Sequence, residues 1–113
     1  MPHCIIEYSN DLIELVTPRE LIGAVYNANE ESRMFDNGDI KVRAMSFAHH
    51  KTVNDTSGFI HVTLKILAGR SLHRKEKLSA LVLKNLDELP LFNVHISVAV
   101  QEIEVASYSK LIK

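Results

Sequence analysis

Four residues of this chain suit acid–base and anion-binding chemistry: Pro2, Lys41, Arg43 and Arg70. Pro2 becomes the first residue if Met1 is removed, as is usual when a small or compact residue follows the initiator methionine. Its nitrogen is then a secondary amine with a free lone pair, on a ring that fixes φ. Because an ordinary α-amino group titrates at roughly 7.7–8.0, modest burial or a nearby cation would make this amine a base at neutral pH. Many proteins begin with Met-Pro, however, so the dipeptide alone does not identify a catalytic terminus.

Three basic residues occupy positions that suit anion binding. Lys41 and Arg43 are two positions apart in an alternating segment, so they share one strand face and can point at a single anionic ligand. Arg70 lies between Gly69 and Ser71 at the turn before a predicted helix, where free N–H groups and a guanidinium together suit a carboxylate. Taken alone, each of the three is more often a solvated charge or a partner in an ordinary salt bridge.

The composition is typical of one small globular domain, which we expect to span residues 1–113. Because the formal net charge is −1, we expect neither nucleic acid nor a membrane as a partner. No run approaches the roughly 20 apolar residues that cross a bilayer, and no signal peptide is recognisable. The single cysteine, Cys4, excludes an internal disulfide and favours a reducing cytoplasm. We expect Cys4 to be a small apolar strand residue and not a nucleophile.

Other catalytic signatures are absent from the sequence. His49 and His50 are the only close histidine pair, but neighbouring strand residues face opposite ways and no spacing of Cys or carboxylates completes a zinc site. We therefore expect no metal site. The sequence also lacks a P-loop, a Gly-x-Gly-x-x-Gly motif and a nucleophile elbow, so no motif indicates nucleotide binding or hydrolysis.

The first half of the chain predicts a strand, a helix and a second strand. Residues 3–8 are apolar and β-prone. A helix should begin at Thr17, with Pro18 in its first position and Glu20 completing a capping box, and it should end before a turn at residues 35–38. Residues 40–47 alternate between apolar and polar faces and predict the second strand.

The second half repeats this order. A loop over residues 54–58 precedes an alternating strand over 59–67. A helix capped by Ser71 should run to about Leu89, because Pro90 ends it. The next strand, over 92–101, has the cleanest alternation, and residues 102–113 form a tail with at most one short strand. The apolar face of the strand over 92–101 consists of Phe92, Val94, Ile96, Val98 and Val100.

Two β-α-β units therefore follow one another, over about residues 2–48 and 59–102. Residues 2–8 align with 60–66 so that His3 falls on His61, which indicates a weak internal duplication. The predicted fold is an α+β two-layer sandwich, with a four-stranded sheet and two helices on one face. The clean apolar alternation suggests that the other face of the sheet packs against another subunit.

Two segments of the sequence resemble a known family. Residues 1–9, Met-Pro-His-Cys-Ile-Ile-Glu-Tyr-Ser, resemble the opening of the 5-carboxymethyl-2-hydroxymuconate isomerases, which belong to the tautomerase superfamily. Residues 61–71 resemble the second strand-to-helix segment of these enzymes. The Gly69-Arg70-Ser71 turn is also similar to that of the related 4-oxalocrotonate tautomerases, and macrophage migration inhibitory factor belongs to the same superfamily. The resemblance covers essentially the whole chain and is loosest over residues 27–57.

The resemblance implies a homotrimer that packs sheet against sheet and acts without metal or organic cofactor. It implies that Pro2 shuttles a proton along a conjugated enol, while Arg70 binds a substrate carboxylate. The strand arginine of the family aligns best with Lys41, with Arg43 as the other matching basic position. Lysine cannot make the two-pronged hydrogen bond of a guanidinium, so Lys41 can alter substrate preference and Arg43 can compensate.

The expected function is therefore proton transfer on a small unsaturated dicarboxylate of the 2-hydroxymuconate type. The named reaction is that of a 5-carboxymethyl-2-hydroxymuconate delta-isomerase in aromatic catabolism. One alternative is a promiscuous keto–enol tautomerase of other enols, such as an aryl pyruvate. Another is a noncatalytic trimeric binding protein with this fold, which follows if Met1 stays attached and the nitrogen of Pro2 remains an amide.

Overall fold

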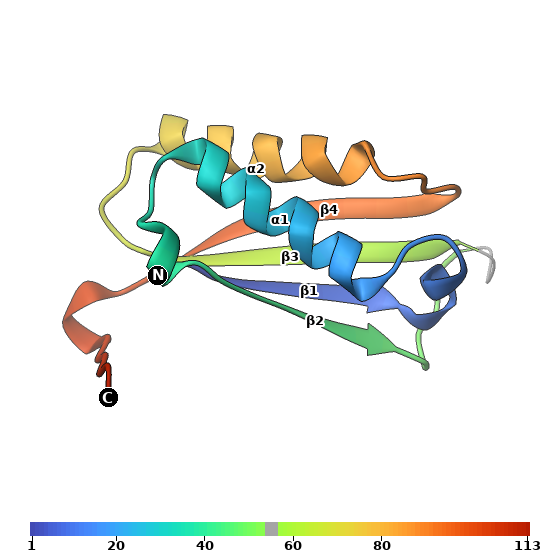
Figure 1. Cartoon of the computed structure of the whole chain (residues 1–113), viewed down its shortest axis with the longest axis horizontal. Coiled ribbons are helices and arrows are strands. Elements are labelled where there is room, and N and C mark those ends of the chain that lie inside the picture. The colour runs from blue at the N-terminus through green and yellow to red at the C-terminus, as the bar shows by residue number, and fades with distance from the viewer. Residues whose placement is uncertain (54–56) are drawn as a thin grey trace.

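A four-stranded sheet carries two helices on one of its faces in the computed structural model, which describes residues 1–53 and 57–113 (Figure 1). The first three residues of the loop expected over residues 54–58 lie outside the described residues. The fold class predicted from the sequence is confirmed. The chain runs through β1 (His3–Ser9), α1 (Pro18–Ser32), β2 (Lys41–Phe47), β3 (Gly58–Leu67), α2 (Leu72–Asp87) and β4 (Val94–Ile103).

The strand order is β2-β1-β3-β4. Each β-α-β unit forms a parallel pair, β1 with β2 and β3 with β4, and the two units join through the antiparallel pair of β1 and β3. The first strand is thus an inner strand of the sheet. His3, close to the chain terminus, is paired with Lys41 on one side and Lys65 on the other.

Both helix starts form as the sequence predicts. The Thr17 hydroxyl accepts a hydrogen bond from the Glu20 backbone N–H at 3.2 Å, and the Glu20 carboxylate accepts one from the Thr17 N–H at 3.1 Å. The Ser71 hydroxyl accepts from the Arg74 N–H at 3.2 Å. Gly69, directly before this turn, has φ +127°, a conformation that glycine adopts without strain.

Three boundaries differ from the sequence prediction. Helix α2 ends at Asp87, two positions before Leu89, because Pro90 disfavours helical geometry in the residue that precedes it. Strand β4 begins at Val94, since Asn93 has φ 54° and turns the chain, which leaves Phe92 81% exposed. Strand β4 continues to Ile103, two residues into the expected tail, which then forms a short 3₁₀ turn at Val105–Ser107.

The hydrophobic core lies between the helices and the sheet. It is built from alternate residues of the two inner strands and from one stripe of each helix. The fully buried members of this core are Cys4, Ile6, Leu21, Val25, Ala28, Ile60, Val62, Leu64, Ile66, Val82 and Leu86.

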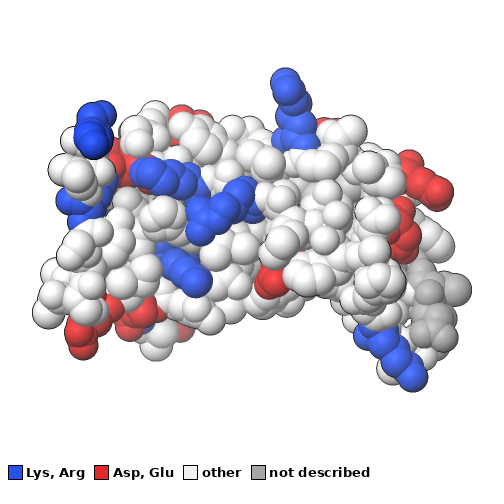
Figure 2. Space-filling view, turned by 90° about the horizontal axis from the view of Figure 1, so that it is seen from below, with Lys and Arg blue, Asp and Glu red and all other residues white. Residues whose placement is uncertain are grey.

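The open face of the sheet carries polar and apolar residues together, which corrects the expectation that the apolar side of the last strand lies on it. The apolar residues of β4, including Val98 and Val100, pack against the core on the helix side. Lysine and arginine side chains gather on one half of the open face in Figure 2. The strand register brings Lys41, His3 and Lys65 side by side there, with Arg43 two residues along β2. Among the described residues, no helix is long and apolar enough to cross a membrane.

A pair of glycine substitutions tests the packing at the start of β3. A Cβ atom at Gly58 would lie 2.6 Å from Leu12 Cδ2, and Leu12 is itself buried. Gly58→Ala should therefore lower the free energy of unfolding by about 1–3 kcal/mol, measured by urea denaturation. The control is Gly23→Ala in α1, where nothing lies within 4 Å of the added Cβ and a gain of about 0.5–1 kcal/mol is expected. Equal effects at the two positions would contradict this packing.

Cys4 provides a second test of the core. Its side chain is fully buried, and burial raises the pKa of the thiol to about 11. Since the thiolate is the reactive species, folded protein at pH 8 should react with an aromatic disulfide reagent roughly 100-fold or more slowly than protein unfolded in urea. Rapid reaction of one thiol per chain without denaturant would show that Cys4 is accessible.

Candidate active site

One cavity of about 350 Å³ lies beside the N-terminal end of β1. The N-terminal residue, the segment after α1, the turn before α2 and the C-terminal tail all contribute to it, so four separate parts of the chain meet there. Figure 1 places the chain terminus at this end of the sheet, near the start of the tail. The lining residues are Met1, Arg33, Met34, Phe35, Asp36, Asp39, Leu67, Arg70, Tyr108 and Lys110.

Arg70 is held in this cavity by two contacts. Its Nη2 atom donates a hydrogen bond to the Met34 carbonyl at 3.0 Å, and its Cζ atom lies 4.9 Å from the centroid of the Phe35 ring. Stacking on an aromatic face fixes the plane of the guanidinium. The remaining N–H groups of this guanidinium can therefore bind an anion in a defined orientation.

The N-terminal amine is partly desolvated and lies among charges of both signs. The pKa of the Met1 amine is lowered from its ordinary value of 8.0, first because the amine is partly desolvated. The positive charges of Lys110, Lys41 and Arg70 lower this pKa further, whereas the Asp39 carboxylate opposes them. These surroundings favour a neutral amine, which is the form that accepts a proton.

Pro2 is the first buried residue of the chain. Its carbonyl accepts a hydrogen bond from the Lys41 backbone N–H at 3.1 Å, which continues the pairing of β1 with β2 by one residue. The position of Pro2 is therefore fixed by the sheet.

Lys41 and Arg43 share the open face of β2, as the sequence predicts, but their side chains have different surroundings. Lys41 lines a neighbouring cavity of about 530 Å³ together with His3 and part of the tail, and its Nζ donates to the Asp39 carbonyl at 3.2 Å. Arg43 Nη1 lies 3.2 Å from His3 Nδ1, and Arg43 lines neither of the two cavities. Desolvation, followed by the charge of Arg43, lowers the pKa of His3.

An ion pair stands between the two cavities. Lys110 Nζ lies 2.8 Å from Asp39 Oδ1, and both residues line both cavities, as does Tyr108. The hydrogen bond and charge of Lys110 lower the pKa of Asp39, and the same contact raises the pKa of Lys110.

The sequence analysis did not identify Arg33, Asp39, Tyr108 or Lys110 as site residues. Lys110 and Asp39 are 71 positions apart, and no local pattern marks either one. Arg33 follows the last residue of α1 and has φ 55°, a left-handed conformation that is unusual for a residue other than glycine. Glycine is the usual residue just after a helix, so an arginine at this position is the one local feature of the sequence that could have marked Arg33 as a site residue.

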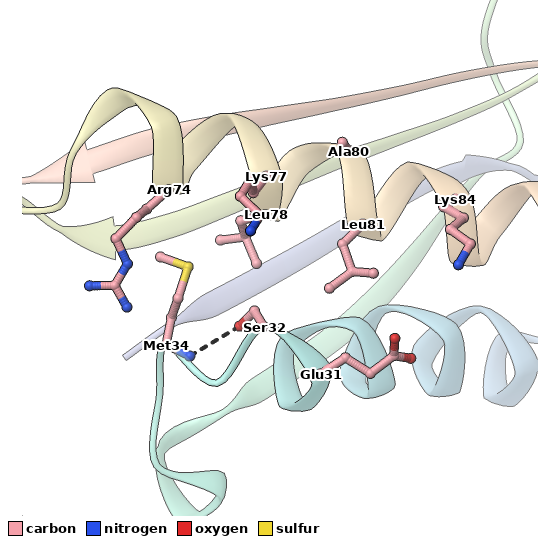
Figure 3. A pocket seen from close by; sticks show the side chains of 9 residues that line it. All are labelled: Glu31, Ser32, Met34, Arg74, Lys77, Leu78, Ala80, Leu81 and Lys84. Carbon is pink, nitrogen blue, oxygen red and sulfur yellow. Dashed lines mark hydrogen bonds between the residues drawn. The ribbon is translucent and has the colours of Figure 1, made fainter.

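A groove between α1 and α2 has a different character (Figure 3). Its volume is about 430 Å³, and Leu78, Leu81 and Met34 form its apolar part. Arg74, Lys77 and Lys84 project from α2 around it. The groove contains neither the amine nor Arg70, so the cavity beside β1 is the candidate active site. Among the residues that the structure describes, no group of three or more His, Cys, Asp or Glu side chains is placed to hold a metal ion.

Comparisons with known proteins identify the family. The sequence model of the family described as 5-carboxymethyl-2-hydroxymuconate isomerase matches residues 2–110. No curated protein matches the chain.

Solved structures share the fold at low sequence identity. A 5-carboxymethyl-2-hydroxymuconate isomerase from Deinococcus radiodurans R1 superposes with a TM-score of 0.82 at 24% identity, over 99% of this chain and 90% of that one. A 5-carboxymethyl-2-hydroxymuconate delta-isomerase superposes with a TM-score of 0.80 at 19% identity, over 100% of this chain and 89% of that one. A fused 4-OT, described as a symmetric trimer, superposes with a TM-score of 0.74 at 13% identity, over 90% of this chain and 85% of that one. With the family match over nearly its whole length, the chain belongs to the 5-carboxymethyl-2-hydroxymuconate isomerase family and is an isomerase.

Proposed function

We propose that this isomerase transfers a proton on a small unsaturated dicarboxylate of the 2-hydroxymuconate type, with the amine of Pro2 as the base. The specific reaction proposed is that of a 5-carboxymethyl-2-hydroxymuconate delta-isomerase in aromatic catabolism. One observation carries the proposal: a single cavity contains the N-terminal residue and a guanidinium that is already fixed by Met34 and Phe35.

Removal of Met1 would convert the observed arrangement into an active one. Met1 itself lines the cavity, so its loss leaves room for a substrate. The nitrogen of Pro2, now part of a buried peptide bond, would become a free amine at the wall of that space. Because the strand register fixes Pro2, the amine would keep a constant position relative to Arg70.

The charges of the cavity suit an enol substrate. Arg70 would bind one carboxylate, and Arg33, which lines the same cavity, is the candidate partner for a second. As the amine removes a proton, negative charge builds up along the conjugated system, and the fixed cations stabilise it. Desolvation and the same cations lower the pKa of the Met1 amine, and they would likewise favour a neutral Pro2 amine before the reaction.

Lys41 and Arg43 remain candidate substrate-binding residues with different requirements. Lys41 acts on the amine through its charge from the adjoining cavity. Arg43 points its guanidinium at His3 on the open face, so we infer that it would reach a substrate only where another subunit covers this face.

We also propose a cytoplasmic homotrimer with a single domain per chain. The fused 4-OT neighbour is a symmetric trimer of the same fold, and here one face of the sheet has no helix over it. Since that face carries Lys41, Arg43 and Lys65 beside Ile5 and Met45, its contacts in a trimer would combine hydrogen bonds and ion pairs with apolar packing.

A tautomerase of monocarboxylate enols is the second candidate function. Asp36 and Asp39 also line the cavity, and their negative charge reduces its attraction for a second substrate carboxylate. Comparing kcat/KM for 2-hydroxymuconate with kcat/KM for an enol aryl pyruvate would distinguish the two functions.

Substitution of Pro2 tests the proposed base. Pro2→Ala should lower kcat on 2-hydroxymuconate by about 10²-fold or more, since a flexible primary amine replaces the ring-fixed secondary amine. Protein that carries one extra residue ahead of Pro2 should be inactive, because the nitrogen is then an amide. Intact mass establishes the state of Met1 in each sample. Full activity of Pro2→Ala would rule out the proline base.

Substitution of Arg70 tests carboxylate binding. Arg70→Ala should lower kcat/KM by about 10²-fold, with most of the loss in KM, because it removes a fixed charged donor. Arg74→Ala is the matched control, since Arg74 lines the groove between the helices and not this cavity. Equal losses for the two variants would contradict the site assignment.

The pH profile reports the state of the amine. The amine must be neutral to accept a proton. The surroundings lower the pKa of the Met1 amine from 8.0, and we expect the Pro2 amine of the trimmed protein to be lowered by the same surroundings. kcat/KM should therefore fall as the pH drops through this lowered pKa, and it should level off above it. The measurement is kcat/KM between pH 5 and pH 9 in buffers of constant ionic strength. A profile whose half-maximal point lies at or above pH 8.0 would show that the pKa of the amine is not lowered.

A further inference from the structure

The C-terminal tail is tied to the N-terminal end of the sheet by a polar contact. Lys110 Nζ reaches Asp39 Oδ1 at 2.8 Å, and the two side chains are 35% and 36% exposed. Asp39 is the last residue of the 3₁₀ turn Asn37–Asp39, directly before β2. Beyond the contact, Leu111 and Ile112 are 84% and 81% exposed. The end of the tail is therefore held through Lys110 and not by apolar burial.

This contact lies on the boundary between two cavities. Asp39, Lys110 and Tyr108 line the cavity of Met1 and Arg70, and they also line the cavity of Lys41 and His3. A substrate anion in the first cavity would therefore meet Asp39 at close range. The Lys110 ammonium is bound to that carboxylate and compensates its charge.

Asp39 acts against the chemistry proposed for the amine. A carboxylate near an amine stabilises the ammonium form, and a carboxylate near a substrate anion repels it. Desolvation lowers the pKa of the Met1 amine, Asp39 raises it, and Lys110, Lys41 and Arg70 lower it; the Pro2 amine of the trimmed protein would lie near the same charges. The other charged groups around the amine are Arg33 and Asp36, which line its cavity, and His3, whose own pKa is lowered.

We propose that Lys110 is a positioning residue for the isomerase reaction, which pairs with Asp39 and so keeps that carboxylate from stabilising the ammonium form of the amine and from repelling the substrate. The proposal rests on the proposed function in one respect, since it takes the N-terminal amine as the base. It assigns to the tail a task that needs no contact between Lys110 and the reacting atoms.

The experiment compares Lys110→Met, Lys110→Arg, Asp39→Asn and the double variant Lys110→Met/Asp39→Asn. Lys113→Met is the matched control, because Lys113 is an exposed lysine of the same tail. Two readouts are needed in the trimmed protein. One is the pH profile of kcat and KM. The other is direct titration of the Pro2 nitrogen by NMR of ¹⁵N-proline-labelled protein, in which the nitrogens of Pro18 and Pro90 do not titrate.

Lys110→Met removes a positive charge and also unmasks Asp39, so both effects raise the pKa of the amine. The expected rise is about 0.3–0.7 pH unit, with a roughly threefold rise in KM for a dicarboxylate. Lys110→Arg should restore both values, and Lys113→Met should change neither. Asp39→Asn should shift the amine pKa downward. In the Asp39→Asn background, Lys110→Met should produce no more than about half of its shift, because only its own charge remains to be lost.

Two results would overturn the proposal. One is an amine pKa that is the same in Lys110→Met as in the parent protein. The other is a shift that is equally large with and without Asp39, which would mean that Lys110 acts by its own charge alone. The NMR titration follows the amine whether or not it is the catalytic base. Failure of the proposed function would appear instead as full activity in Pro2→Ala, with the NMR shift still present.

Discussion

The site depends on one constraint, which is that the chain terminus begins an inner strand of the sheet. His3 is paired with Lys41 on one side and Lys65 on the other, so the first residues are held by two neighbours. Chain ends usually fray, and a free amine at a frayed end has no defined environment. Here the hydrogen bond from the Lys41 N–H to the Pro2 carbonyl fixes the backbone of the residue that would carry the free amine. The cavity can therefore have a constant geometry even though its central group is a terminus.

The other parts of the cavity are positioned by the ends of helices and strands. Arg70 enters from a turn that needs both the unusual φ of Gly69 and the cap formed by Ser71. The Met34 carbonyl and Phe35 ring that hold Arg70 come from the segment after α1, whose direction follows from the left-handed conformation of Arg33. Packing of the two helices on one sheet brings these turns together. At this end of the molecule, the packing that stabilises the core therefore also sets the geometry of the site.

The sequence predicts those features that depend on local pattern. Period-two alternation, the capping box at Thr17 and the Gly69-Arg70-Ser71 turn are each encoded within a few neighbouring residues, and the structure contains all of them. Which side of an alternating strand faces the helices is decided by tertiary packing, and so β4 alone could not show that its apolar side lies under the helices and not on the open face. The positive φ of Asn93 ended an alternation that looked continuous from Phe92. The Asp39–Lys110 pair joins residues 71 positions apart, and only the completed fold reveals it.

The charged residues of the cavity act on a substrate together, so the effect of each depends on the others. Arg33, Arg70 and Lys110 line it together with Asp36 and Asp39, so three cations face two carboxylates. A cavity with cations alone would bind anions more strongly but would also attract phosphate and other abundant anions without discrimination. Because Lys110 is already bound to Asp39, the charges left for a substrate are the fixed guanidinium of Arg70 and that of Arg33, with Asp36 opposing them. Substrate selection should then depend on how far the second carboxylate lies from the first, because only Arg70 is rigidly oriented.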